Sequence, residues 1–221
     1  MTITTEGAGQ VVTGTAVDKA GNSASASVTL NIDKTPPAIT ATATPAANAN
    51  GWNNTDVTVT FTCSDATSGI AVCPAPITVT TEGAGQKICG TAIDNAGNSA
   101  NTCVTLNIDK TPPVLNVTVP PWPPNHKMVN ILPLITVSDN LTSVKVELVS
   151  VVSNEPDNGL GDGDTANDIV VNADGTISLR AERSGTGNGR VYTITYKATD
   201  LAGNVTVSSA TAIVPHDMGK K

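Results

Sequence analysis

The chain repeats itself at a fixed offset. Residues 5–37 return, with a small number of changes, as residues 81–113, an offset of 76 positions. Self-similarity at a fixed period is typical of modular arrays, because each repeat is a unit that folds in the same way as its neighbours. We therefore expect several small domains in series and not one large enzyme fold.

Composition favours a secreted all-β array. Only 14% of the residues are charged and 2% are aromatic, while Thr, Val, Ala, Asn and Gly are abundant, which disfavours long helices. A net charge of −7 argues against nucleic-acid or anionic-membrane partners and leaves divalent cations as the natural counter-charge. No apolar run reaches the length of a membrane span, so membrane insertion is not expected. Residues 1–4 do not form a signal peptide, so an export signal would lie upstream.

Two copies of the string Asp-Lys-Thr-Pro-Pro, at residues 33–37 and 109–113, divide the chain. Each follows a strand-like alternation and ends it, because proline cannot continue a ladder. We interpret both as short, stiff linkers. The predicted domains are the C-terminal half of a module at 1–36, with its last three strands, a complete module at 37–113, an enlarged module at 114–217 and a tail at 218–221.

The third module is related to the others through one turn. The pattern Asp-x-Ala-Gly-Asn at residues 200–204 matches residues 94–98 and 18–22. Before it, Tyr192, Ile194, Tyr196 and Ala198 alternate with polar residues and predict a half-buried strand. About seven short strands per module, with turn signals between them, fit a two-sheet sandwich.

The four cysteines are predicted to form two disulfides. Cys89 and Cys103 correspond to Thr13 and Ser27 of the first copy, so both are missing there together. They flank the hairpin loop at 94–98, and counting back from that loop sets them directly across from one another. The remaining pair is Cys63 and Cys73.

A zinc site is the alternative for these cysteines, but their spacing is not Cys-x-x-Cys, and His126 and His216 are remote in the sequence. Two disulfides predict an oxidising setting, outside the cell or in a periplasm.

Three motifs resemble the immunoglobulin-like repeats of large bacterial surface and secreted proteins. They are the Asp-x-Ala-Gly-Asn turn, the Asp-Lys-Thr-Pro-Pro linker and the string Trp-Pro-Pro-Asn-His-Lys-Met-Val at residues 122–129. The resemblance covers nearly the whole chain. It implies tandem immunoglobulin-like β-sandwiches joined by Pro-Pro linkers, in an extracellular structural or adhesive array that is often tightened by calcium. This chain departs from a regular array in its half-module and its enlarged last module.

Topology predicts calcium sites as well. In such a sandwich the loop between the second and third strands, the last hairpin turn and the preceding linker meet at one end. Their carboxylates would repel, whereas Ca²⁺ takes six to eight oxygen ligands. The ordinary alternative is that each side chain caps its own turn. The predicted ligands are Asp33, Asp65, Asp94 and Asn98 in the second module, and Asp109, Asp139, Asn140, Asp200 and Asn204 in the third.

Residues 155–168 form a second candidate calcium site. This stretch has five acidic residues and no basic ones, and its glycines allow backbone carbonyls to turn inward. It is not an EF-hand loop, because the required order of ligands is absent. The alternative is a solvated acidic loop. The predicted ligands are Asp157, Asp162, Asp164 and Asp168.

The sequence contains no recognisable catalytic motif, neither Gly-x-Ser-x-Gly nor His-Glu-x-x-His. We expect a non-catalytic structural or adhesive array whose partners are neighbouring repeats or further copies of the chain, assembled head to tail into a fibre. The alternative is a ligand- or glycan-binding accessory module of a secreted enzyme, which would use residues 122–128 and the acidic loop. Truncation of a longer array, or strands donated by a second chain, would explain the half-module.

Overall fold

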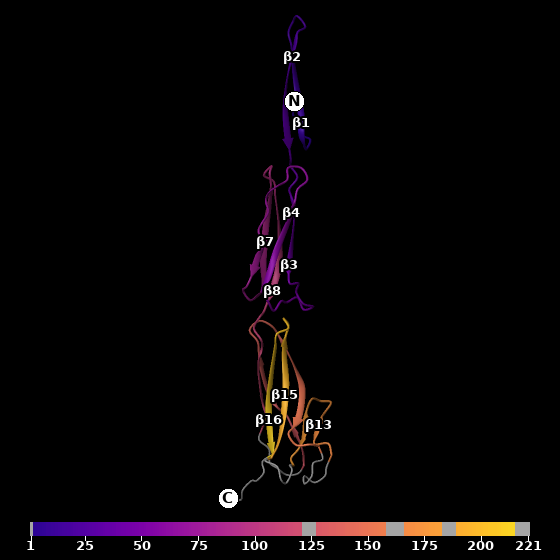
Figure 1. Ribbon diagram of the computed structural model, residues 1–221, viewed down its shortest axis with the longest axis vertical. Helices are drawn as coiled ribbons and strands as arrows, with labels where there is room; N and C mark the ends of the chain where they lie inside the picture. Colours follow the sequence, from indigo (N-terminus) through magenta and orange to yellow (C-terminus); the bar gives the residue numbers. More distant parts are fainter. Residues whose placement is uncertain (1, 121–126, 158–165, 183–188, 215–221) are drawn as a thin grey trace. The chain divides into compact units, whose positions relative to one another are not determined.

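A computed structural model describes residues 2–120, 127–157, 166–182 and 189–214. The regular structure of these residues is entirely β, and every ladder between its named strands is antiparallel (Figure 1). The all-β prediction is confirmed. The chain divides into two compact units, Met1–Ile108 and Asp109–Lys221. None of the described segments is a helix with the length and apolarity needed to cross a membrane.

The first copy of the repeat is a β-hairpin of two strands, β1 (Gly7–Val17) and β2 (Ser23–Ile32), drawn in indigo in Figure 1. The prediction of three strands for residues 1–36 is therefore wrong. The equivalent segment of the second module, Ile77–Val79, forms a strand by pairing with Val57–Ser64, and residues 2–6 have no such partner strand among the described residues. The side chain of Gln10 donates to the carbonyl oxygens of Thr5 and Gly7 at 2.9 and 3.1 Å, but Gln86 makes the same two bonds directly after the strand of the second module, so these bonds do not prevent a strand.

The second module is a sandwich of two three-stranded sheets. One sheet contains β3 (Ala38–Thr44), β4 (Val57–Ser64) and β6 (Ile77–Val79), and the other contains β5 (Ile70–Val72), β7 (Gly83–Asp94) and β8 (Ser99–Ile108). Side chains alternate across a strand, so every second residue of β4 faces inward. Val57, Val59 and Phe61 of β4 are buried against Leu106 and Ile108 of β8.

Both predicted disulfides are present. Cys63 is bonded to Cys73 and Cys89 to Cys103, with Cα atoms 5.9 and 4.1 Å apart. The β7–β8 ladder pairs Cys89 directly with Cys103, as expected from the hairpin count. Cys63 follows Val57, Val59 and Phe61 on the inner side of β4, and its bond ties that sheet to the segment after β5.

The described residues of the third module form eight strands. Two strands pair as β9 (Val114–Thr118) and β11 (Leu134–Ser138), and three form the order β10 (Met128–Ile131), β14 (Ile177–Arg180) and β13 (Ile169–Val171). The longest sheet contains β12 (Val144–Ser153), β15 (Arg190–Asp200) and β16 (Val205–Val214). Its core is richer than that of the second module, because Tyr192, Ile194 and Tyr196 of β15 are all buried. The alternation predicted for this strand is confirmed.

The same turn joins the strands of three hairpins, β1–β2, β7–β8 and β15–β16. In the second module the N–H of Asp94 donates to the carbonyl oxygen of Asn98, and Gly97 between them adopts φ of 92°, which favours glycine. The same backbone bond joins Asp18 to Asn22 and Asp200 to Asn204. The turn thus places an aspartate directly after β1 and at the end of β7 and of β15.

Candidate metal centres

Three aspartates of the third module converge. Asp109 precedes β9, Asp139 follows β11 and Asp200 ends β15, so they come from distant parts of the sequence. One carboxylate oxygen from each lies within 4.8 Å of the others. Asp109 and Asp200 are buried, with 0% and 5% of their surface exposed. This is the set that the topological argument predicted for the third module.

The second module repeats the arrangement. Asp33 precedes β3, Asp65 follows β4 and Asp94 ends β7, and one carboxylate oxygen from each again lies within 4.8 Å of the others. Asp94 is 1% exposed. The two clusters therefore use equivalent positions. In each module one aspartate lies ahead of the first strand, one directly follows the strand paired with that first strand, and one belongs to the hairpin turn.

The loop aspartates cap their own turns with one oxygen. Oδ1 of Asp139 accepts the N–H groups of Leu141 and Thr142 at 3.0 and 2.7 Å. Oδ1 of Asp65 accepts the N–H groups of Ser68 and Gly69, both at 2.9 Å. The capping alternative is thus correct for one oxygen of each carboxylate. Oδ2 of Asp65 and of Asp139 takes no part in these caps and remains available for the cluster.

The second oxygen of Asp139 has the environment of a metal ligand. Its Oδ2 is buried and accepts no hydrogen bond from the residues that the structure describes. A buried carboxylate oxygen without a donor loses its hydration and gains nothing in exchange. At an effective dielectric constant of about 20, two unit charges 4.8 Å apart also repel by about 3 kcal/mol. A divalent cation would remove both costs, and oxygen donors from carboxylates suit Ca²⁺.

The carboxyl group of Asp65 is held in its charged form. Partial burial raises its pKa, but hydrogen bonds from the N–H groups of Gly69, Ser68 and Thr67 outweigh that effect, and the net pKa lies below its ordinary value. A carboxylate that stays ionised is the form that binds a metal ion.

Asn98 and Asn204 hydrogen-bond to the hairpin aspartates of the two predicted sites. Nδ2 of Asn98 donates to Oδ2 of Asp94 at 2.8 Å and to the carbonyl oxygen of Asp33 at 3.3 Å. Nδ2 of Asn204 makes the same two bonds, to Asp200 and Asp109, at 2.7 and 2.8 Å. Each asparagine thus presents its amide nitrogen to the hairpin aspartate and ties the linker to the turn. Asn140 is exposed to solvent.

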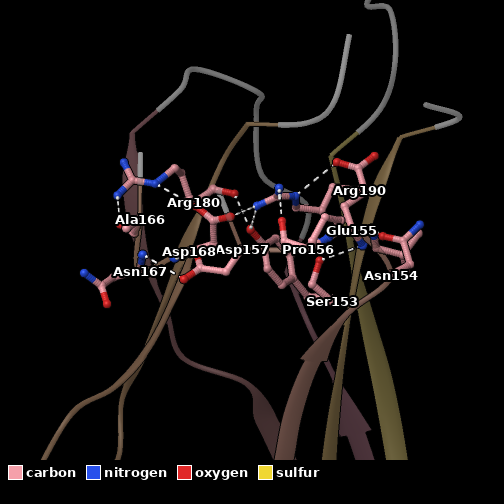
Figure 2. A network of polar contacts seen from close by, with 12 residues as sticks. Ser153, Asn154, Glu155, Pro156, Asp157, Ala166, Asn167, Asp168, Arg180 and Arg190 are labelled. Atoms are coloured by element: carbon pink, nitrogen blue, oxygen red, sulfur yellow. Dashed lines mark hydrogen bonds and ion pairs between the residues drawn. The ribbon is translucent and has the colours of Figure 1, made fainter. Parts of the chain in front are cut away.

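The described part of the acidic loop forms an ion-pair network and not a carboxylate cage (Figure 2). Oδ1 of Asp168 accepts from Nε of Arg180 at 3.0 Å, and Oδ2 pairs with Nη1 of Arg190. Both oxygens of this buried carboxylate are therefore bound by guanidinium groups. These contacts conflict with the prediction of Asp168 as a calcium ligand, because its charge is already compensated.

Arg190 is the centre of this network. Its side chain is fully buried, and its Nε lies 3.2 Å from Oε2 of Glu155 while Nη2 donates to the carbonyl oxygen of Pro156 at 3.3 Å (Figure 2). Burial disfavours its charge, but hydrogen bonds to Tyr192, Asp168 and Glu155 outweigh burial and raise the pKa of Arg190 above its ordinary value. Its guanidinium therefore stays charged inside the module.

Two neighbours complete the network. Tyr192 donates from Oη to the carbonyl oxygen of Arg180 at 2.9 Å, and burial raises the pKa of its hydroxyl, so it remains a donor. Asp157 accepts the N–H groups of Asp168 and Asn167 at 2.8 and 3.2 Å (Figure 2). These hydrogen bonds lower the pKa of the Asp157 carboxyl.

The sequence carried a signal for this network that composition alone did not reveal. The inward residues of β15 are the even-numbered ones from Tyr192 to Ala198, and Arg190 falls on the same face at the start of the strand. Extending the alternation by one step would have placed a buried arginine there. Such a residue requires a carboxylate partner, and the acidic loop supplies two.

Several predicted residues lie outside the described part of the chain. These are Asp162 and Asp164 of the acidic loop, residues 122–126 of the proline-rich string, which include His126, and His216. The glycan-binding alternative depends mainly on that string and on the loop.

Comparisons with known proteins give a likeness of fold. No family model and no curated protein matches the chain. Among solved structures, the protocadherin gamma B4 extracellular domain matches at 15% identity with a TM-score of 0.42, covering 92% of this chain and 38% of that one. Protocadherin gamma B2 extracellular cadherin domains 3–6 match at 16% identity with a TM-score of 0.37, covering 93% and 56%.

These neighbours are themselves extracellular cadherin domains. The chain spans 38% of the length of the first and 56% of the length of the second. At TM-scores below 0.5 the likeness carries no argument about activity or ligands. The fold class rests on the sheets themselves, which are stacked as immunoglobulin-type sandwiches.

Proposed function

We propose that this chain is a non-catalytic, extracellular structural or adhesive array whose modules are stiffened by calcium. The observation that carries the proposal is the recurrence of a three-aspartate cluster at equivalent positions of two modules, Asp33, Asp65 and Asp94 in one and Asp109, Asp139 and Asp200 in the other. A chance cluster of exposed acidic residues has no reason to recur with the module.

The position of each cluster supports a mechanical role. Asp109 belongs to the linker that precedes the third module, whereas Asp139 and Asp200 belong to two loops of that module. An ion bound to all three would fasten the linker to both loops, in addition to the bond from Asn204 to the carbonyl oxygen of Asp109. Bending of the linker at that point would then require loss of a ligand, so the array would be stiff when calcium is present.

The extracellular setting is supported by the two disulfides, which persist in oxidising compartments. The proposed partners are neighbouring repeats or further copies of the chain, as in a fibre.

Calcium titration tests the proposal. Binding at 100 times the Kd would stabilise a module by about 2.7 kcal/mol. The melting temperature of the third module, followed by the near-ultraviolet signal of Tyr192 and Tyr196, should rise with calcium and fall back with chelator. Asp139→Asn should abolish this rise, because asparagine keeps the turn-capping oxygen and loses the charge.

Asp174→Asn is the matched control. Asp174 caps its own turn through Thr176 at 3.0 and 2.7 Å and lies outside both clusters. This variant should respond to calcium as the unmodified chain does. A melting temperature that is the same in calcium and in chelator for the unmodified chain would disprove calcium stiffening.

A further inference from the structure

The β1–β2 hairpin exposes a face that is buried in the complete module. In the second module the inward side of β7 and β8 is covered, and Ala92, Leu106 and Ile108 are 0%, 4% and 0% exposed. The hairpin has the same residues at these positions, Ala16, Leu30 and Ile32, but none of them is buried. We call this side the open face; it consists of Val12, Gly14, Ala16, Ala24, Ala26, Val28, Leu30 and Ile32.

The differences between the two copies lie mainly away from the open face. Only Val12 and Ala26 differ from their counterparts on this side, where the second copy has Ile88 and Thr102. The other differences lie on the opposite side or in the turn, at Val11, Thr13, Val17, Lys19, Ser25 and Ser27. The apolar character of the open face is thus kept while the rest of the hairpin varies.

A glycine on the open face points to what covers it. In the second module a Cβ atom at Gly90 would lie 2.6 Å from Cε1 of Phe61, so the aromatic ring of the covering sheet requires glycine there. Gly14 is the equivalent residue, yet a Cβ at Gly14 would meet no atom within 4 Å among the described residues. Its backbone does not have a positive φ either. Glycine inside a strand weakens the strand, and it often marks a close approach by another group.

We propose that the open face of β1–β2 is a docking surface for an apolar antiparallel sheet of the kind formed by β3, β4 and β6, with an aromatic ring seated on Gly14. In the second module that sheet presents Val57, Val59 and Phe61 from its central strand and Val79 from β6. The open face offers the same partners for them, with Val12 in place of Ile88.

The occupant is a further half-module whose own inner face is unpaired, and not a second copy of this chain. In this chain β3, β4 and β6 are already packed on β7 and β8, and Val57 and Val59 are 0% exposed. A second copy would have to expose that core in order to cover the hairpin. The apolar area buried on the hairpin would then be offset by the apolar area exposed in the second copy. A half-module with the pattern of residues 37–80 has no such cost.

The test extends the chain by a second copy of residues 37–80, placed before Thr5 as residues 37–80 stand before Thr81. Hydrogen exchange of the β1 and β2 amides should slow by at least about tenfold relative to the unextended chain, because covered strands open less often. The amides of β7 and β8 report in the same sample that the rest of the chain is folded. Unchanged exchange in β1 and β2 would overturn the proposal.

Gly14→Ala distinguishes seating of a ring from nonspecific covering. In the extended chain this substitution should speed exchange in β1 and β2 again, whereas in the unextended chain it should not. When Phe61→Ala is also made in the appended copy, Gly14→Ala should no longer speed hydrogen exchange in β1 and β2. If Gly14→Ala changes hydrogen exchange in β1 and β2 equally with and without the extension, the ring contact is refuted.

Sedimentation of the unextended chain over a concentration series tests the other occupant. If its mass grows with concentration while the β1 and β2 amides become protected, a second copy covers the open face and the proposed occupant is wrong. We expect no coupled change of this kind.

Discussion

Replacing Arg190 by methionine tests whether the buried network holds the third module together. Arg190 is the largest of the fully buried side chains among the described residues. It pairs with Asp168 and Glu155, whose side chains are only 3% and 10% exposed. Methionine fills much of the same volume without a charge, so the main effect of the change is electrostatic.

The expected loss follows from the two carboxylates left behind. Breaking a buried ion pair by removing one partner costs about 3–5 kcal/mol, because the other charge stays buried without compensation. Arg180 still binds Oδ1 of Asp168 at 3.0 Å, so we expect the lower end, about 3 kcal/mol. For a unit of this size each kcal/mol lowers the melting temperature by roughly 4 °C, which gives a drop of about 12 °C.

Thermal unfolding followed by the near-ultraviolet tyrosine signal measures this drop, since both tyrosines of the chain lie on β15. Lys145→Met is the control; it removes an ion pair to Glu147 in which the lysine side chain is 74% exposed, and it should change the melting temperature little. A further change of Asp168 to leucine in the Arg190→Met variant should recover part of the loss. If Arg190→Met costs less than about 1 kcal/mol, the argument from buried charge is wrong.

Three further predictions concern other parts of the chain. Replacing Cys89 by threonine and Cys103 by serine reproduces the hydrogen-bonded pair that the first copy has at 2.7 Å, and urea unfolding of the second module should show a loss of about 3 kcal/mol. Tyr192→Phe leaves the carbonyl oxygen of Arg180 without its 2.9 Å donor and should cost about 1–3 kcal/mol in the same assay. Asp157 has a lowered pKa in the folded state, so its stabilising effect is fully present above about pH 4 and is lost as the pH falls through the folded value. Asp157→Asn should therefore flatten the dependence of melting temperature on pH between about 5 and 2, and an unchanged slope would contradict this assignment.

Local pattern predicted much of this protein because strands obey short-range rules. The period of two along β15 identified Tyr192, Ile194 and Tyr196 as buried, and the repeated turn aligned the cysteines of β7 and β8. These features depend only on residues near one another in the sequence. The pairing of Cys63 with Cys73 followed once the other pair was assigned.

Other features failed because they depend on contacts that the pattern does not encode. The expected third strand is absent from the described residues of 1–36 because the segment equivalent to β6, which pairs with β4 in the second module, has no strand to pair with there. The predicted calcium ligand Asp168 is instead bound by Arg180 and Arg190. In both cases the outcome depends on a partner elsewhere in the fold, which alternation along one strand does not reveal.

The sequence by itself determined the all-β class, the repeat and the disulfide register, since these follow from periodicity and a short hairpin count. Tertiary structure decided how close the charges come and which of them are compensated. Asp109, Asp139 and Asp200 are separated by many residues, and the distances between their carboxylates depend on how three loops pack. Electrostatic energy varies with those distances and with burial, so the same acidic residues form a cluster of like charges at one site and a compensated network around Arg190 at another.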